Sequence, residues 1–322
     1  MIPKEISYEI IENVYKQLSH YIIKTPLIKN NSYSLNLFNT NLFLKLEFLQ
    51  NAGCFKTRGV INNLLNLSEE QKNNGITAVS AGNHAIATSY GANKFSLRNK
   101  IFMYETANNF RKKTVKTLGA NLYLTNPQDA FKDVENASKN EGYYFVHPFD
   151  GKFTIQGTAS LGYEICQQVD NIDNIIVSVG GGGLISGVGS IIRQKFPQCN
   201  IIGVEPEGAK GMTESLKKDK PIKQVNINSI ADSLCSPLHM DYSFSICKSV
   251  IDKMINVSDN DLINAMKFMY ENFKLILEPA CVAGIAALLG PLKNKLVNQN
   301  TVVILCGSNM DLKSWNNILA KI

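Results

Sequence analysis

Several short segments of this chain carry groups that could do chemistry, and the first holds a lysine. Residues 51–59 read Asn-Ala-Gly-Cys-Phe-Lys-Thr-Arg-Gly, and Lys56 lies between an apolar, strand-like run at 42–49 and a helix-like run at 60–67. A lysine at such a turn points into the cleft at the carboxyl end of a sheet, where its amine can act as a nucleophile. Taken alone, a lysine is more often a solvated surface charge.

A run of four glycines is the second segment. It follows a buried, strand-like run at 175–179 and precedes a helix-like run at 185–192. Its residues are Gly180, Gly181, Gly182 and Gly183, followed by Leu184. Residues without a Cβ let backbone N–H groups turn around an anion, and a helix start adds its positive dipole end. A tight turn is the simpler reading of a glycine run, but four in a row at this junction favour a phosphate-binding loop.

The third segment follows a short strand-like run at 76–79. It contains Ser80, Ala81, Gly82, Asn83 and His84. Backbone amides at a helix start suit a carboxylate, and the Asn83 side chain can donate to a phenolic oxygen. Because His84 has no Asp, Ser or metal-ligand partner at a suitable spacing, it fits a structural or orienting role better than a catalytic one.

Two further motifs lie at predicted element ends. They are Glu278-Pro-Ala and Cys306-Gly-Ser-Asn309. A buried cysteine usually behaves as a small hydrophobic residue, so Cys306 alone indicates no function.

The elements that must position these segments alternate between strand and helix. Strands are predicted at 42–49, 76–79, 100–104, 121–124, 143–146, 175–179, 201–204 and 302–305, and an amphipathic helix at 7–20. This alternation is typical of parallel α/β sheets, which bind ligands at the carboxyl ends of their strands. We expect residues 71–146 to form a small domain, inserted into a larger one made of residues 1–70 and 147–322.

Composition excludes several classes of protein. The chain has 322 residues, 44% of them hydrophobic, and a formal net charge of +6. No basic run with interleaved aromatics indicates nucleic-acid binding, and Lys112, Lys113 and Lys116 fit a solvated helix face. The longest apolar run, 280–289, is too short to cross a membrane, and the N-terminus resembles no secretory signal. Seven scattered cysteines suit reduced thiols in the cytoplasm.

Together, the motifs resemble the fold type II pyridoxal-phosphate enzymes of the serine/threonine dehydratase and serine racemase group, with threonine dehydratases the most similar. Further matching segments are Thr25-Pro-Leu27, His147-Pro148, Gln156-Gly-Thr158, Gly203-Val-Glu-Pro206 and Ala231-Asp232. The resemblance covers nearly the whole chain. It implies a tryptophan synthase β-subunit-like fold, with two three-layer, open parallel-sheet domains of which the larger binds the cofactor, and a homodimer or homotetramer.

The resemblance also assigns roles to individual residues. Lys56 would bind pyridoxal 5′-phosphate covalently and then act as the base on the substrate Cα. The glycine loop with Leu184 would hold the phosphate, Asn83 the 3′-oxygen, and Phe55 would pack against the ring, with Glu278 nearby. Residues 80–84 would bind the substrate. Cys306 would face the pyridine nitrogen, where a neutral thiol makes the ring a weaker electron sink and favours elimination over transamination.

Ala81 separates the predicted reaction from that of the racemases. The racemases of this group carry a serine there as a second acid/base, and alanine has no proton to give. We therefore expect an L-threonine/L-serine ammonia-lyase. The alternatives are a serine racemase, a dehydratase of another hydroxyamino acid such as hydroxyaspartate, or a non-catalytic phosphate-binding protein, against which Lys56 argues.

Other positions depart from the family pattern. Cys54 and Ser308 stand where the family usually has serine and glycine. Of the three groups that hold a cation in the racemases, Glu205 and Ala209 fit but Gly211 replaces an aspartate, so any divalent or monovalent cation site would be weak. Because the chain ends at Ile322, soon after Cys306, we expect no regulatory domain and no feedback by isoleucine.

Overall fold

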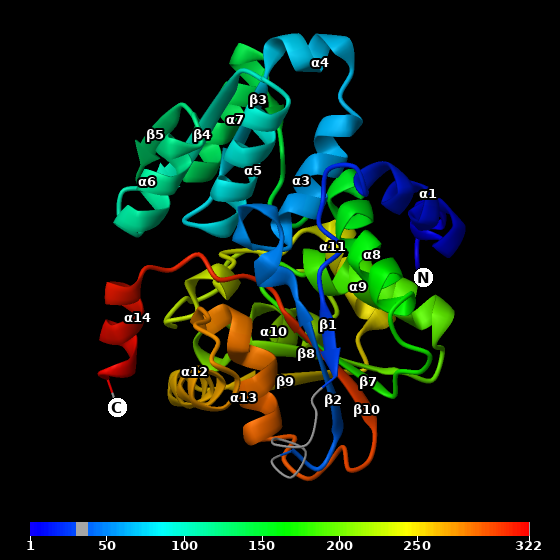
Figure 1. Ribbon diagram of the computed structural model, residues 1–322. Coiled ribbons are helices and arrows are strands. Elements are labelled where there is room, and N and C mark those ends of the chain that lie inside the picture. Colours follow the sequence, from blue (N-terminus) through cyan, green and yellow to red (C-terminus); the bar gives the residue numbers. More distant parts are fainter. Residues whose placement is uncertain (30–37, 322) are drawn as a thin grey trace.

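The larger of two open sheets has six strands in the computed structural model, which describes residues 1–29 and 38–321 (Figure 1). In spatial order they are β1 (Leu27–Lys29), β2 (Asn41–Leu46), β10 (Asn300–Leu305), β7 (Asn174–Ser178), β8 (Asn200–Pro206) and β9 (Lys253–Val257). All neighbours are parallel except β1 and β2. Val302 of β10 lies opposite Phe43 on one side and Ile175 on the other. Such central strands are buried on both faces, which explains their continuous β-branched runs.

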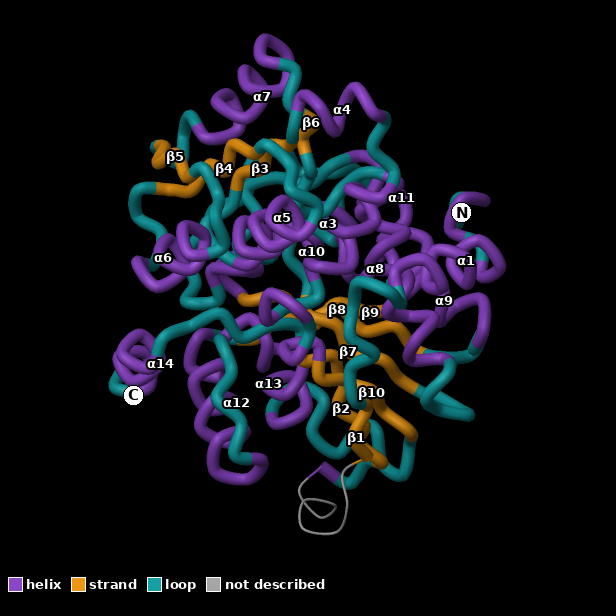
Figure 2. Tube along the Cα trace, turned by 45° about the horizontal axis from the view of Figure 1, so that its top comes forward, coloured by secondary structure: helices purple, strands orange, loops and turns teal. Residues whose placement is uncertain are grey.

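Helices cover both faces of this sheet. Figure 2 shows α8 and α9 on one side and α12 and α13 on the other. The helices outside the smaller sheet's region are α1 (Tyr8–Leu18), α3 (Lys56–Leu65), α8 (Lys152–Cys166), α9 (Gly183–Lys195), α10 (Gly211–Lys217), α11 (Asp241–Val250), α12 (Asp259–Phe273), α13 (Ala283–Leu289) and α14 (Leu312–Leu319). One large apolar core packs the sheet against most of these helices, whereas Val60 and Leu64 of α3 belong to a separate apolar cluster.

The smaller sheet has four parallel strands. Their order is β5 (Leu122–Thr125), β4 (Asn99–Tyr104), β3 (Ile76–Val79) and β6 (Tyr144–Phe145). The helices of this region are α4 (Glu69–Asn74), α5 (Asn83–Lys94), α6 (Asn109–Thr117) and α7 (Ala130–Glu141). Successive residues of β3 point to opposite faces of this sheet. Ala78 packs in the apolar cluster that contains Ile86 of α5, whereas Val79 packs with Val134 of α7. We call residues 69–145 the small lobe and the other described residues the large lobe.

The chemistry-bearing segments meet because they follow the carboxyl ends of strands. Residues 80–84 follow β3, residues 180–183 follow β7, and Cys306 follows β10. Lys56 follows β2 after two short 3₁₀ turns. Ala52, within the second turn, has a φ of 59°, in the left-handed region. The candidate site therefore lies between the two lobes, at the edge where parallel sheets bind ligands.

The predicted strands are confirmed to within a few residues, while three details differ. β1 and β9 were not predicted, and β1 runs antiparallel to β2, so the larger sheet is mixed rather than purely parallel. The helix expected at 60–67 begins at Lys56 itself. The division into domains at residues 70 and 146 stays a prediction.

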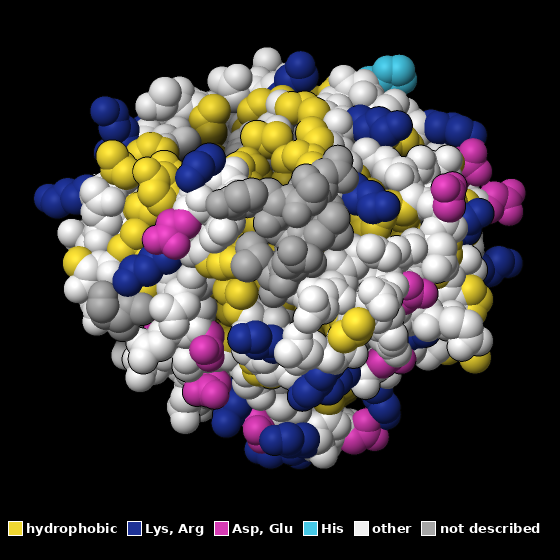
Figure 3. All heavy atoms as spheres, turned by 60° about the horizontal axis from the view of Figure 1, so that its bottom comes forward, with side chains coloured by type: hydrophobic (Ala, Val, Ile, Leu, Met, Phe, Trp, Pro, Cys, Tyr) yellow, Lys and Arg dark blue, Asp and Glu magenta, His cyan; other side chains and the backbone are white. Residues whose placement is uncertain are grey.

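The described surface carries charges of both signs. On the face drawn in Figure 3, Lys and Arg side chains are scattered among Asp and Glu side chains, as on ordinary protein surfaces. Lys113 and Lys116 are exposed, as predicted for a solvated helix face. Among the described residues, no helix is both long and apolar enough to span a membrane.

Candidate active site

Lys56 is the first residue of α3, and backbone contacts fix the turn before it. The Phe55 N–H donates to the Cys306 carbonyl oxygen at 3.0 Å, and Cys54 pairs with Gly307 as an antiparallel bridge. The Lys56 side chain points to the Pro148 carbonyl oxygen, which accepts a hydrogen bond from its Nζ. Burial lowers the pKa of Lys56 to about 8. Much more of this amine is therefore uncharged near neutral pH than of an ordinary lysine.

A buried cluster of four charges lies behind this turn, and sequence reasoning missed it. Its members are Lys45, Glu47, Arg58 and Glu164, all with 0% exposed side chains. Arg58 donates to both Glu47 oxygens at 2.8 Å and to both Glu164 oxygens at 3.1 Å. Because Arg58 is two residues from Lys56, the cluster fixes the first turn of α3 against β2 and α8.

Two cavities meet at Lys56. The smaller, about 50 Å³, is lined by the glycine loop, Phe55, Ser178 and Cys306. The larger, about 320 Å³, is lined by residues 80–84 and by small-lobe and large-lobe segments around them. Lys56, Asn83, Phe149, Gly181 and Ser233 border both cavities. The lysine thus has a phosphate-type loop on one side and a wider space on the other.

The glycine loop has the features of an anion site. Gly182 has a φ of 95°, and a Cβ on Gly183 would come within 2.5 Å of the Phe149 carbonyl oxygen. The N–H groups of Gly180, Gly181 and Gly182 make no backbone hydrogen bond to any described residue. The buried Ser178 hydroxyl, at the end of β7, also lacks a partner within the described part of the chain. These free donors at the start of α9 fit a phosphate group.

Residues 80–84 lead into α5, whose first two residues are Asn83 and His84, and they form one wall of the larger cavity. The Ser80 hydroxyl accepts a hydrogen bond from the Gly82 N–H at 3.1 Å. His84 is buried, its Nε2 lies 2.7 Å from the Val146 carbonyl oxygen, and burial, helped by Lys56, lowers its pKa to about 3. The His84 ring is therefore neutral and held by the backbone, and its structural or orienting role stays a prediction.

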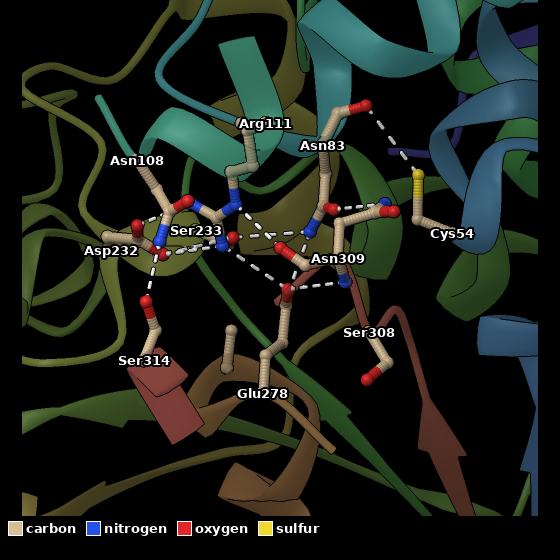
Figure 4. Close-up of polar contacts among 12 residues, drawn as sticks. Cys54, Asn83, Asn108, Arg111, Asp232, Ser233, Glu278, Ser308, Asn309 and Ser314 are labelled. Carbon is tan, nitrogen blue, oxygen red and sulfur yellow. Dashed lines mark hydrogen bonds and ion pairs between the residues drawn. The ribbon is translucent and has the colours of Figure 1, made fainter. Parts of the chain in front are cut away.

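A polar network lies behind Asn83 (Figure 4). Its amide Nδ2 donates to Glu278 at 2.6 Å and to Ser233 at 3.2 Å, and its Oδ1 accepts from Asn309 at 2.7 Å. Glu278 also accepts from the Asn309 N–H at 3.1 Å and pairs with Arg111. The structure therefore places Glu278 behind Asn83, whereas Phe55, Leu184 and Cys306 line the smaller cavity itself.

Glu205 and Ala209, the predicted cation ligands, lie apart from both cavities. The Glu205 carboxylate accepts hydrogen bonds from the N–H groups of Met212 and Thr213 and from the Thr213 hydroxyl, at 2.7–2.8 Å. Burial raises its pKa to about 7. Within residues 1–29 and 38–321 there is no group of three or more His, Cys, Asp or Glu side chains that could hold a metal ion. The weak cation site stays a prediction.

Comparison with known proteins decides the family. Residues 18–307 match the family described as pyridoxal-phosphate dependent enzyme. The chain belongs to this family. The smaller cavity fits its cofactor, because the glycine loop and Ser178 offer donors for a phosphate and Lys56 borders the same space.

Three relatives illustrate this family's range. Phenylserine dehydratase from Ralstonia pickettii is 40% identical, over 95% of this chain and 94% of its own length. The solved structure of processed threonine deaminase isoform 2 from Solanum lycopersicum is 31% identical, with a TM-score of 0.90 over 98% of this chain and 94% of that one. Maize serine racemase is 30% identical, with a TM-score of 0.90 over 98% and 97%.

Several site residues in this pyridoxal-phosphate dependent enzyme had no local signal in its sequence. Arg58 lies inside the predicted motif at 51–59, but its partner Glu164 is 106 residues further along the chain, and the Ser178 hydroxyl has no partner among the described residues. Arg111 is buried, although nothing in the local pattern separates it from Lys112 and Lys113. Only the long-range contacts of the fold distinguish these residues.

Proposed function

We propose that this pyridoxal-phosphate dependent enzyme is a dehydratase (ammonia-lyase) that converts L-threonine, L-serine or both into a 2-oxo acid and ammonia. The observation that carries the proposal is the meeting at Lys56 of the glycine-loop cavity and the cavity walled by residues 80–84. The names of the relatives support it, since two of the three are a dehydratase and a deaminase.

The hydrogen-bond donors that line the smaller cavity indicate how the cofactor would lie. The N–H groups of Gly180–Gly183 and the Ser178 hydroxyl would hold its phosphate, and Phe55 would pack against its ring. Asn83 would donate to its 3′-oxygen in place of its 3.2 Å contact with Ser233. Cys306 would face the ring nitrogen, where a thiol is a weaker partner than a carboxylate. When bound, pyridoxal phosphate supplies an electron sink for the substrate Cα.

Lys56 would move the proton in this reaction. With its lowered pKa, about 8, its released amine can take the Cα proton near neutral pH. The Ser80 hydroxyl and the first N–H groups of α5 would hold the substrate carboxylate. Loss of the Cα proton and the β-hydroxyl group releases water, and hydrolysis of the unsaturated product gives the 2-oxo acid and ammonia. Ala81, which borders the same cavity, offers no proton for racemisation.

A β-aryl substrate is the second candidate. Tyr104 and Phe131 line the larger cavity, together with Pro237 and Ile227. Aromatic and aliphatic walls favour a bulky apolar β-substituent. The relative at 40% identity is named phenylserine dehydratase, which supports the same reading.

The test is release of 2-oxo acid from a panel of hydroxyamino acids. The panel contains L-threonine, L-serine, D-serine, hydroxyaspartate and phenylserine. We expect activity with at least one L-β-hydroxyamino acid, loss of it in Lys56→Ala, and no loss in the control Lys24→Ala, since Lys24 is exposed. Racemisation of L-serine without release of 2-oxo acid, or no reaction with any member, would contradict the proposal.

We further propose a cytoplasmic homodimer or homotetramer. All seven cysteines are unpaired, as in proteins of reducing compartments. Light scattering on the purified protein measures the assembly, and a monomer at micromolar concentration would contradict this part.

A further inference from the structure

Arg111 joins the two lobes beside the candidate site. It lies in the first turns of α6 in the small lobe, and its side chain is 2% exposed. All its charged partners belong to the large lobe. Its Nη1 and Nη2 pair with the Asp232 carboxylate, Nη2 lies 3.3 Å from Glu278 Oε2, and Nε donates to the Asn309 carbonyl oxygen at 2.8 Å.

The same large-lobe groups also hold Asn83. Glu278 accepts from the Asn83 amide at 2.6 Å, and Asn309 donates to its Oδ1 at 2.7 Å. Figure 4 shows Arg111 and Asn83 reaching Glu278 from two small-lobe helices. Arg111 and Asn83 therefore share the Glu278 carboxylate, one at each of its oxygens.

Arg111 also packs against the substrate-facing loop. A Cβ on Gly82 would lie 2.8 Å from Arg111 Nη1, so the loop and the guanidinium touch. A second contact from α6 supports the same junction. Its N-cap residue Asn108 donates to Asp311 at 3.1 Å and to Ser314 at 2.8 Å, both in the large lobe.

The buried charges stabilise the contact between α6 of the small lobe and the large lobe. Glu278 is 1% exposed, so moving Arg111 away would leave a buried carboxylate without its cation. Asp232 is 49% exposed and borders the larger cavity, so its carboxylate can regain water when the pair opens. Of the two carboxylates that pair with Arg111, only Asp232 would therefore regain water if the contact opened, whereas Glu278 would stay buried.

We propose that Arg111 is a positioning residue that locks the loop at residues 80–84 over the substrate by tying the small lobe to Asp232, Glu278 and Asn309. We call this tie between the lobes the Arg111 lock. Its effect on kinetics rests on the proposed function, whereas the contacts that form the lock do not. Arg111 borders the larger cavity, but its nitrogens are directed at Asp232, Glu278 and Asn309, so we assign it no contact with the reacting atoms. It sets the fraction of molecules whose lobes are arranged to bind substrate, and saturating substrate restores that arrangement.

The kinetic test compares Arg111→Met, Arg111→Lys and the control Lys113→Met. Lys113 is exposed on the same helix. We expect Arg111→Met to raise KM about tenfold or more, the factor that losing one charge-assisted hydrogen bond gives, with a smaller change in kcat. Arg111→Lys should recover part of the effect and Lys113→Met should match the wild type. Unchanged KM in Arg111→Met, or a fall in kcat alone, would overturn the lock.

Hydrogen exchange on the ligand-free protein tests the lock without any reaction. Arg111→Met should exchange faster at residues 80–84 and 108–117, while α12 in the large lobe keeps its protection. A raised KM with unchanged exchange would mean that Arg111 binds substrate directly, and would overturn the proposal. If the wild type proves inactive on the whole panel, the proposed function fails while this measurement still decides the lock.

A second variant, Asp232→Asn, tests the proposal even if Arg111→Met fails to fold. Asp232→Asn keeps the shape of a half-exposed side chain, so it should fold. We expect it to raise KM and speed exchange at residues 108–117, and to add little when combined with Arg111→Met because both remove one pair. Fully additive effects, or wild-type exchange in Asp232→Asn, would overturn the proposal.

Discussion

Removing Arg58 tests whether the buried charge cluster supports the turn that presents Lys56. In Arg58→Met, two fully buried carboxylates, Glu47 and Glu164, lose the four hydrogen bonds at 2.8–3.1 Å that Arg58 donates. Breaking one buried ion pair costs roughly 3–5 kcal/mol, against total stabilities of about 5–15 kcal/mol. With an m-value of about 3 kcal/mol per M, the urea midpoint should fall by about 1–2 M.

A double variant that also neutralises one of the two carboxylates separates the loss of the ion pair from the loss of the arginine side chain. Since most of the cost is a buried carboxylate left without its cation, Arg58→Met/Glu47→Gln should regain about 1 kcal/mol or more over Arg58→Met. The control Lys139→Met removes an exposed pair, with side chains 74% and 58% exposed, and should change stability by about 0.5 kcal/mol or less. Urea unfolding followed by circular dichroism measures all three. A loss below about 1 kcal/mol in Arg58→Met, or a further loss in the double variant, would refute the argument.

Three more predictions follow from the site. Because the pKa of Lys56 is lowered to about 8, the rate at which cofactor-free protein takes up pyridoxal phosphate should rise with pH around a midpoint near 8, and a midpoint near 10 would contradict the burial argument. Ala81→Ser places a hydroxyl at the larger cavity and should give D-serine from L-serine by chiral chromatography; equal D-serine in wild type and variant would show that Ala81 does not control racemisation. Gly181→Ala should lose about 1–3 kcal/mol and bind cofactor weakly, because its Cβ would collide with the Phe149 ring, whereas Gly290→Ala should bind normally; tight cofactor binding by Gly181→Ala would argue against the phosphate loop.

The sequence predicts what depends on local pattern. Strands such as β3 and β7 are short apolar runs followed by glycine or serine, so both their position and the segments at their carboxyl ends could be read directly. β1 has only three residues, two of them exposed, and β9 alternates buried and less buried positions, so neither stood out. The antiparallel pairing of β1 depends on where the chain returns, which its residues do not specify.

Long-range polar contacts could not be predicted in this way. Lys45 sits inside an apolar strand and pairs with Glu164, 119 residues further along the chain. Arg111 meets Asp232 across 121 residues, and Glu278 across 167. The sequence shows where a charged residue stands but not which partner permits its burial, because that partner depends on how distant segments of the chain pack together.

The most direct test of the central claim is the chemical identity of the group on Lys56. We predict that purified protein incubated with pyridoxal phosphate turns yellow, and that borohydride reduction fixes the cofactor to one peptide. Mass spectrometry should find the added mass on Lys56, and Lys56→Ala should stay colourless. A protein that remains colourless with added cofactor, or a label on another lysine with Lys56 unmodified, would contradict the account.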